Sequence, residues 1–198
     1  MDARALAGMG RVALAALPLG RAAAATPINR GVLRLAAVGL RAAATELHVD
    51  DDYCSTCAND GYTWGANAFA SIASALASAD DSGDTIHLHP GVYPAVTVGA
   101  GKDKLTIEGV DPDAVFIDGD GGAFAVKLED VRGVRLSQLT IRNAERGVWL
   151  AAAGTLGNET AAYRCELEHV LIHSCDEAIY TDRKSAIDVR NCTLATDG

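Results

Sequence analysis

The chain has 198 residues, of which 49% are hydrophobic and 22% charged, so its composition predicts a folded domain and excludes extensive disorder. Its net charge of −9 argues against nucleic acid and anionic membranes as partners, because both would repel it. No run of about 20 apolar residues is free of charge, so the sequence predicts no transmembrane helix.

Residues 1–45 differ in composition from the rest of the chain. They are rich in Ala, Leu and Arg, and their only acidic residue is Asp2. Two short apolar runs, Val12–Gly20 and Val32–Leu40, are followed by small residues, as in an export signal. We therefore expect a leader that directs the protein to the outside or the surface of a cell. The alternative is translated upstream DNA behind a misassigned start codon.

Residues 46–84 are predicted to form a short strand, an acidic loop and a helix. Glu46–Val49 has the composition of a strand, and Asp50–Gly61 that of a loop. The helix is predicted over residues 67–79, where apolar side chains recur at helical spacing at Phe69, Ile72, Leu76 and Ala79.

The acidic loop contains candidate metal ligands and two of the five cysteines. Oxygen donors suited to Ca²⁺ are Asp50, Asp51, Asp52, Asn59 and Asp60, although their spacing is not that of an EF-hand, and a solvated loop is the alternative. Cys54 and Cys57 form a C-x-x-C with no second such pair, which favours a local disulfide in an exported protein over a zinc site. Cys165 and Cys175 are further disulfide candidates.

From residue 85 to residue 198 the hydrophobic period is two, which predicts strands and turns. One apolar pattern, h-x-h-x-x-h-x-h, occurs three times, in Val134–Ile141, Cys165–Ile172 and Ile187–Leu194. Each copy describes two short strands joined by a tight corner, and a third apolar strand follows the first two copies, at 148–150 and 178–180. This repeat predicts an all-β parallel β-helix with three short strands per rung, in preference to an immunoglobulin-like sandwich.

The two ends of such a solenoid are expected to be covered in different ways. The first rung has an open edge, and we expect the helix at 67–79 to lie across it as a cap. The chain stops within a rung, so it looks truncated, and its C-terminal partner would be further rungs of the same polypeptide.

Five stretches carry a family resemblance: HVDDD, NDGYTWGANAF, IASALASADDSGDTIHLHPGVY, LTIEG and IDGDG. Through them, residues 46–198 resemble the N-terminal region of pectin-lyase-like right-handed parallel β-helix proteins, in particular large bacterial secreted or surface proteins. The resemblance implies the handedness of the helix. It implies little about chemistry, because the Gly83–Tyr93 element occurs in lyases, esterases and proteins without known activity. It also implies a polar ladder formed by Asn143, Ser174 and Thr196.

The register of the repeat stacks the outward residues of the first strand into files. One file is Arg135, Glu166 and Asp188; the next is Ser137, Glu168 and Arg190. Extended backwards, the first file takes in His87 and Thr106, and the second His89 and Glu108. His87 and His89 also form an H-x-H, which supplies too few ligands for a metal on its own.

In the resembled enzymes the substrate groove follows this face. The acids Glu166, Glu168 and Asp188 would bind a cation or raise one another's pKa, and Arg135 and Arg190 would bind uronate carboxylates. The alternative is a solvated, charge-balanced sheet face. Trp64 would stack on a sugar or pack beside the helix.

The sequence is compatible with three functions. We expect a non-catalytic structural or adhesin-like module, or a module that binds a polysaccharide or cell-surface glycan, without a cofactor other than Ca²⁺. The alternative is a polysaccharide lyase or glycoside hydrolase acting on an acidic polysaccharide, with catalytic rungs beyond residue 198.

Overall fold

The structure is a computed structural model that describes residues 43–80, 83–151, 164–182 and 185–196. Nearly all of the predicted leader, residues 1–45, lies outside the described residues. No helix in the described ranges is long and apolar enough to cross a membrane.

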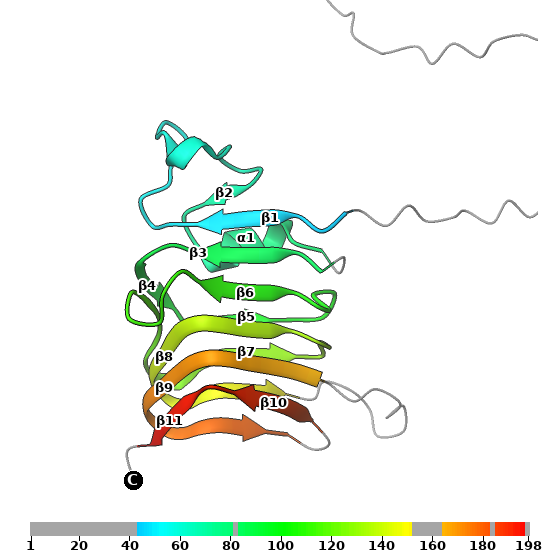
Figure 1. Ribbon diagram of the computed structural model, residues 1–198, viewed down its shortest axis with the longest axis vertical. Coiled ribbons are helices and arrows are strands. Elements are labelled where there is room, and N and C mark those ends of the chain that lie inside the picture. Colours follow the sequence, from blue (N-terminus) through cyan, green and yellow to red (C-terminus); the bar gives the residue numbers. More distant parts are fainter. Residues whose placement is uncertain (1–42, 81–82, 152–163, 183–184, 197–198) are drawn as a thin grey trace, which may run out of the picture. The chain divides into compact units, whose positions relative to one another are not determined.

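The described residues form eleven strands and two short helices (Figure 1). The helices are the 3₁₀ helix η1 (Asn59–Gly61) and α1 (Ile72–Ser78). The strands are β1 (Glu46–Val49), β2 (Ala68–Phe69), β3 (Thr85–Leu88), β4 (Gly91–Pro94), β5 (Val96–Val98), β6 (Thr106–Gly109), β7 (Val115–Glu129), β8 (Arg135–Ala151), β9 (Arg164–Thr181), β10 (Ala186–Arg190) and β11 (Thr193–Thr196).

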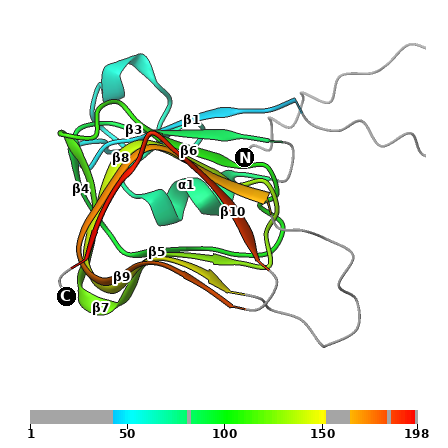
Figure 2. The same ribbon diagram turned by 60° about the horizontal axis from the view of Figure 1, so that its bottom comes forward.

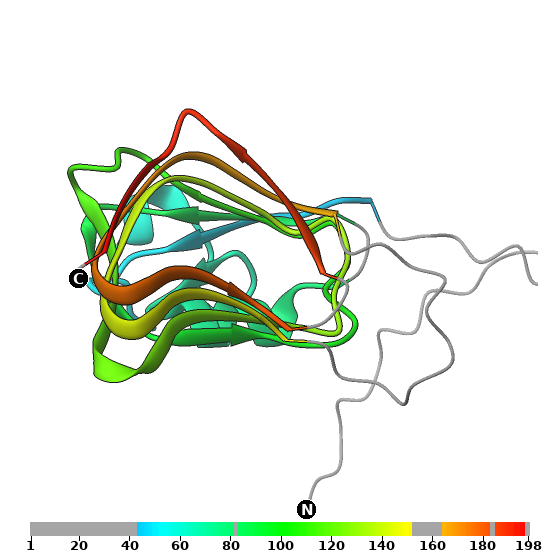
Figure 3. The same ribbon diagram turned by 90° about the horizontal axis from the view of Figure 1, so that it is seen from below.

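The strands wind into stacked coils, and every pairing among the named strands is parallel. The first sheet has the order β2-β1-β3-β6, followed by the beginnings of β8 and β9 and then β10. The second sheet contains β4, the beginning of β7, the middle of β8 and β9, and β11. The third contains β5 and the ends of β7, β8 and β9. Figure 3, seen from below, shows these sheets enclosing a common interior.

Aliphatic side chains stack inside the coils at one register. In the first sheet, the consecutive partners are Leu47, Ile86, Ile107, Leu136 and Leu167, and each is at most 1% exposed. Burial of each such side chain stabilises the fold by about 1.5–3 kcal/mol. The predicted three-strand repeat is confirmed, since Leu136 pairs with Leu167, Ile141 with Ile172 and Val148 with Ile179.

Single residues with a positive φ make the tight corners of the repeat. Gln138, His169 and Asn191 have φ of 55°, 53° and 51° at the corner between the first and second strands. Asn143 and Ser174 have φ of 57° and 54° at the next corner. This left-handed conformation lets the chain turn in one residue, so the inward alternation resumes directly after each corner.

The polar ladder differs from the one predicted. Asn143 Nδ2 donates to Asp118 Oδ1 of the preceding coil at 2.9 Å, whereas the Ser174 hydroxyl lies 3.0 Å from its neighbour His173. Thr196 pairs with Cys175 and so is not at the position equivalent to Ser174. The register shift between Leu194 and Thr196 moves it.

The backward extension of the outward files was confirmed for Thr106 and Glu108, which pair with Arg135 and Ser137, but it was wrong by two residues for the histidines. Thr106 pairs with Thr85, and Glu108 pairs with His87, so His87 belongs to the file of Glu108 and His89 lies beyond it. A shift of two keeps apolar residues inward, so hydrophobic alternation alone does not distinguish these registers.

The predicted helix at 67–79 is shorter in the structure. Ala68 and Phe69 instead pair with β1 as strand β2, and the Ser71 side chain caps α1 by accepting from Ser74 N. Ile72, Ala75 and Leu76 of α1 are buried in the common core. In Figure 2 α1 lies between β3 and β5, both of which it contacts. Its capping role stays a prediction.

Cys54 and Cys57 form a disulfide in the loop between β1 and β2. The prediction of a disulfide for Cys165 and Cys175 was wrong, because both side chains are buried thiols. Cys165 pairs with Ile187 in the first sheet, whereas Cys175 pairs with Ala144 beyond the second corner. They therefore belong to different sides of the coil.

Gly147 is a position where the coils leave no room for a side chain. A Cβ there would lie 2.6 Å from Ile172 Cγ2 and 2.7 Å from the Ala178 carbonyl oxygen. We expect Gly147→Ala to lower the free energy of unfolding by about 1–3 kcal/mol, measured by urea denaturation. Gly99→Ala is the control, because no atom lies within 4 Å of its added Cβ. Equal stability of the two variants would contradict this packing.

Asp118 links two coils at the second corner. Burial raises its pKa, but the Asp120 N–H, Arg142 and Asn143 all donate to the carboxylate, and the net effect lowers the pKa below 3.8. The ion pair with Arg142 is 2.8 Å long. The resulting stability is present above pH 3.8 and is lost as pH falls through the lowered pKa.

We therefore expect Asp118→Asn to cost about 1 kcal/mol at pH 7 and to flatten the fall of stability below pH 4. The exposed Asp113→Asn serves as the control. Thermal unfolding between pH 2.5 and pH 7 measures both effects, and parallel pH profiles for Asp118→Asn and the wild type would refute the role of this carboxylate.

Candidate functional site

The outward face of the first sheet, which we call the first-sheet face, carries the charged residues predicted from the repeat. These residues lie in the predicted register. Arg135 pairs with Glu166 and Glu166 with Asp188; Ser137 pairs with Glu168 and Glu168 with Arg190. The Arg135 guanidinium forms an ion pair with Glu168 of the next coil, which joins the two files diagonally. Arg135 therefore neutralises Glu168 on the same face of the sheet. This is the arrangement expected if the face is a solvated, charge-balanced surface.

A histidine cluster continues this face toward β1. The His48 ring stacks on Tyr62 with 3.6 Å between ring centres, and His87 lies 5.0 Å away on the other side. His87 also contacts Glu46 and, at 3.8 Å, Glu108. Burial lowers the pKa of His48, and the neighbouring His87 lowers it further. Among the residues that the structure describes, none is a hydrogen-bond partner for the buried His48 Nδ1, in keeping with a neutral ring.

A second group of titratable side chains lies where β1 and β3 end. Ligand atoms of Asp50, Asp60 and His89 lie within 4.8 Å of one another. Tyr53 Oη donates to Asp60 Oδ2 at 3.1 Å and lies 3.3 Å from His89 Nε2. Burial, followed by the bond to Asp60, raises the pKa of Tyr53, so this hydroxyl keeps its proton.

Two of the predicted Ca²⁺ ligands, Asp50 and Asp60, therefore have His89 as an additional neighbour that was not expected. Asp50, Asp51 and Asp52 also lie within 4.8 Å of one another as a contiguous, more exposed group. Sequence reasoning paired Asp60 with these acids and missed His89. The H-x-H motif indicated that His89 could bind a metal, but only the fold of the loop brings Asp60 close to His89.

The outward face of the third sheet holds a group that sequence reasoning missed, which we call the third-sheet row: Lys127, Arg146, Trp149 and Tyr180. Lys127, Trp149 and Tyr180 occupy one register on successive coils. Lys127 Nζ lies 4.7 Å from the Trp149 ring centre, and the Arg146 guanidinium lies 4.5 Å from that of Tyr180. The predicted strands at 148–150 and 178–180, aligned end to end, would place Trp149 opposite Ile179. Only the offset that pairs Leu136 with Leu167, continued into the third strand, places Trp149 beside Tyr180.

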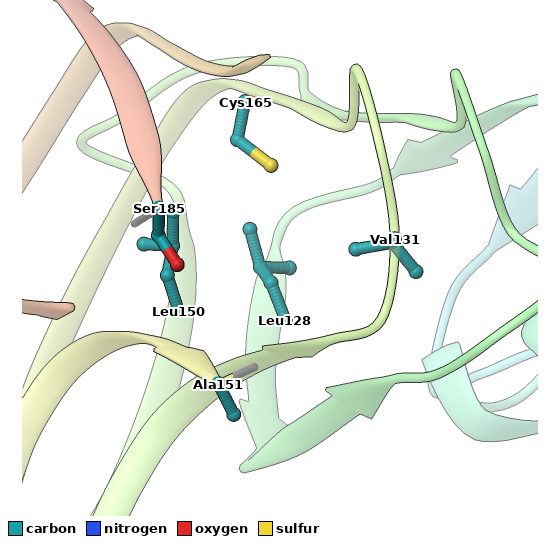
Figure 4. Close-up of a pocket in the computed structure, with 6 residues that line it drawn as sticks. All are labelled: Leu128, Val131, Leu150, Ala151, Cys165 and Ser185. Carbon is teal, nitrogen blue, oxygen red and sulfur yellow. The ribbon is translucent and has the colours of Figure 1, made fainter. Parts of the chain in front are cut away.

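The pocket in Figure 4 is part of the core rather than a candidate site. It is lined by Leu128, Val131, Leu150, Ala151, Cys165 and Ser185. Burial raises the pKa of the Cys165 thiol, which keeps it protonated and a poor nucleophile.

Trp64 is 41% exposed in the loop between β1 and β2. It lies on a different part of the chain from the third-sheet row, and its sugar-stacking role stays a prediction.

Searches of protein-family models and of characterised sequences find no match to this chain. Solved structures do match. A pectin methylesterase from carrot aligns with 77% of this chain at 16% identity and a TM-score of 0.50. The pectin methylesterase PemA from Erwinia chrysanthemi aligns with 79% of the chain at 16% identity and a TM-score of 0.40.

The chain covers 53% of the carrot enzyme, about half of its length. At this identity the likeness concerns the path of the backbone and not the catalytic residues. Together with the parallel coils, it shows that the chain has a right-handed parallel β-helix fold like that of the carrot enzyme.

Proposed function

We propose that this β-helix binds an uncharged polysaccharide or cell-surface glycan through the third-sheet row, without turning it over. The observation that carries the proposal is the in-register stacking of Lys127, Trp149 and Tyr180 on three successive coils. The C–H faces of sugar rings pack against aromatic rings, and sugar hydroxyls accept from cationic side chains. Both kinds of contact are available in this row.

The row is partly open to solvent and held in place by its neighbours. Trp149 and Tyr180 are half-buried, with ring centres 6.4 Å apart. Trp149 Nε1 donates to Asp182 Oδ2 at 3.0 Å, which fixes the orientation of the indole ring. Such prior ordering reduces the entropy that binding would otherwise cost.

Local charge favours an uncharged ligand over a polyuronate. Lys127 pairs with Glu129 at 3.0 Å, and Arg146 contacts Glu145 and Glu177 at 2.8 and 3.3 Å. With Asp182, four carboxylates therefore surround two cations. A ligand with one carboxylate per sugar would meet net repulsion here, and the chain as a whole carries −9.

The contacts of the first-sheet face support the non-catalytic part of the proposal. Glu168 is held by Arg135, and Glu166 lies in register between Arg135 and Asp188. A general base needs a carboxylate free to take a proton from substrate, and an arginine partner opposes this. The alternative function, a lyase or hydrolase for acidic polysaccharides, predicts instead that the protein binds polygalacturonate and releases products from it.

The test titrates the full chain with xylan, galactomannan, β-glucan and polygalacturonate, following tryptophan fluorescence and reducing-end release. The chain has two tryptophans, so a Trp64→Phe background leaves Trp149 as the only reporter. We expect saturable binding to a neutral polysaccharide, no products, and no binding of polygalacturonate.

Trp149→Ala is expected to weaken this binding by roughly thirtyfold, equivalent to about 2 kcal/mol, because aromatic anchors dominate such contacts. Affinity electrophoresis measures the loss, since Trp149→Ala in that background removes the fluorescence signal. Trp64→Ala is the matched control and should bind as the wild type does. Circular dichroism checks that Trp149→Ala folds, and Tyr180→Ala gives a second test. Unchanged affinity in both row variants, or products from polygalacturonate, would overturn the proposal.

A further inference from the structure

We propose that Asp50, Asp60 and His89 form a binding site for a divalent transition-metal ion of the zinc class. The site lies apart from the third-sheet row and is independent of the proposed glycan binding. Its three residues come from separate segments: Asp50 follows β1, His89 follows β3, and Asp60 lies in η1. In Figure 1 the segment that contains η1 extends beyond β1 at the top of the coils.

The hydrogen bonds of Tyr53 determine which nitrogen of His89 is available. Tyr53 Oη donates its proton to Asp60 Oδ2 at 3.1 Å, so toward His89 Nε2, 3.3 Å away, it acts as an acceptor. His89 Nε2 therefore carries a proton. The other ring nitrogen, Nδ1, faces Asp50 Oδ2 at 3.8 Å and is the atom that would bind the ion.

His89 Nδ1 and Asp50 Oδ2 are thus two potential ligand atoms that face each other. The other oxygen of the Asp50 carboxylate, Oδ1, accepts from Asp52 N at 3.0 Å, which leaves Oδ2 directed toward His89. A divalent cation between these two atoms would bind both of them and take the place of any proton on Nδ1. The side chains of His89 and Asp50 are only 22% and 18% exposed, so water screens their attraction for a cation incompletely.

The separations suit coordination after small side-chain movements. Ligand atoms about 2.1 Å from one zinc ion lie up to about 4.2 Å apart, and those of Asp50, Asp60 and His89 all lie within 4.8 Å. Three protein ligands leave a fourth position for water. Tyr53 would support the site from outside, because it holds both Asp60 and His89.

The donor set favours zinc over calcium. Ca²⁺ takes six to eight oxygen ligands, whereas an imidazole nitrogen suits zinc and its neighbours in the transition series. The contiguous group Asp50, Asp51 and Asp52 offers oxygen only and represents the calcium alternative. The two sites share Asp50 and differ in every other residue, so substitutions distinguish them.

The test is calorimetric titration of the full, disulfide-intact chain with Zn²⁺ and, separately, with Ca²⁺. We expect one Zn²⁺ per chain and weaker Ca²⁺ binding. His89→Ala and Asp60→Asn should each reduce Zn²⁺ affinity at least tenfold. The double variant Asp51→Asn/Asp52→Asn and the single variant His87→Ala are the matched controls, and both should bind Zn²⁺ as the wild type does.

Thermal unfolding distinguishes a variant that has lost a metal ligand from a variant that no longer folds. In EDTA, His89→Ala should give a cooperative transition, and Zn²⁺ should raise the Tm of the wild type but not that of this variant. Absence of Zn²⁺ binding, tighter binding of Ca²⁺, or loss of Zn²⁺ binding in the Asp51→Asn/Asp52→Asn or His87→Ala variant would each overturn the proposal.

Discussion

The parallel register between successive coils is the constraint on which the rest of the structure depends. Inward side chains such as Ile107, Leu136 and Leu167 stack directly on one another, and the same pairing places the outward side chains in files. A slip of one residue would turn a buried file toward solvent, so the hydrophobic core fixes the geometry of the surface as well. The third-sheet row is a direct consequence of this register.

Hydrophobic periodicity predicted the regular part of the fold because three copies of one pattern can be aligned. It placed Arg135 beside Glu166 and Glu168 beside Arg190, as the structure does. Before residue 134 there is no copy of the repeated pattern to align, and a shift of two residues preserves the alternation, so His87 was placed in the wrong file. Ala68 and Phe69 fit a helical stripe and a strand equally well, and only their pairing with β1 decides between the two.

The candidate sites were less predictable, because they depend on contacts between segments with no common pattern. The charged face could be listed from sequence, but the diagonal pairing of Arg135 with Glu168 depends on side-chain directions. Asp60 lies 29 positions from His89 in the sequence, and the turn of the 50–61 loop brings them together. Trp149 and Tyr180 could have been found by extending the repeat to its third strand.

The alignment of Lys127, Trp149 and Tyr180 has a consequence for the orientation of a bound polymer. These residues lie on successive coils at one register, so a line through them crosses the strands and runs along the axis of the solenoid. Neighbouring coils are about 4.8 Å apart, a distance comparable to one sugar unit. A glycan held by this row would therefore lie lengthwise, with consecutive sugars on consecutive coils, and its contact length would grow with the number of coils.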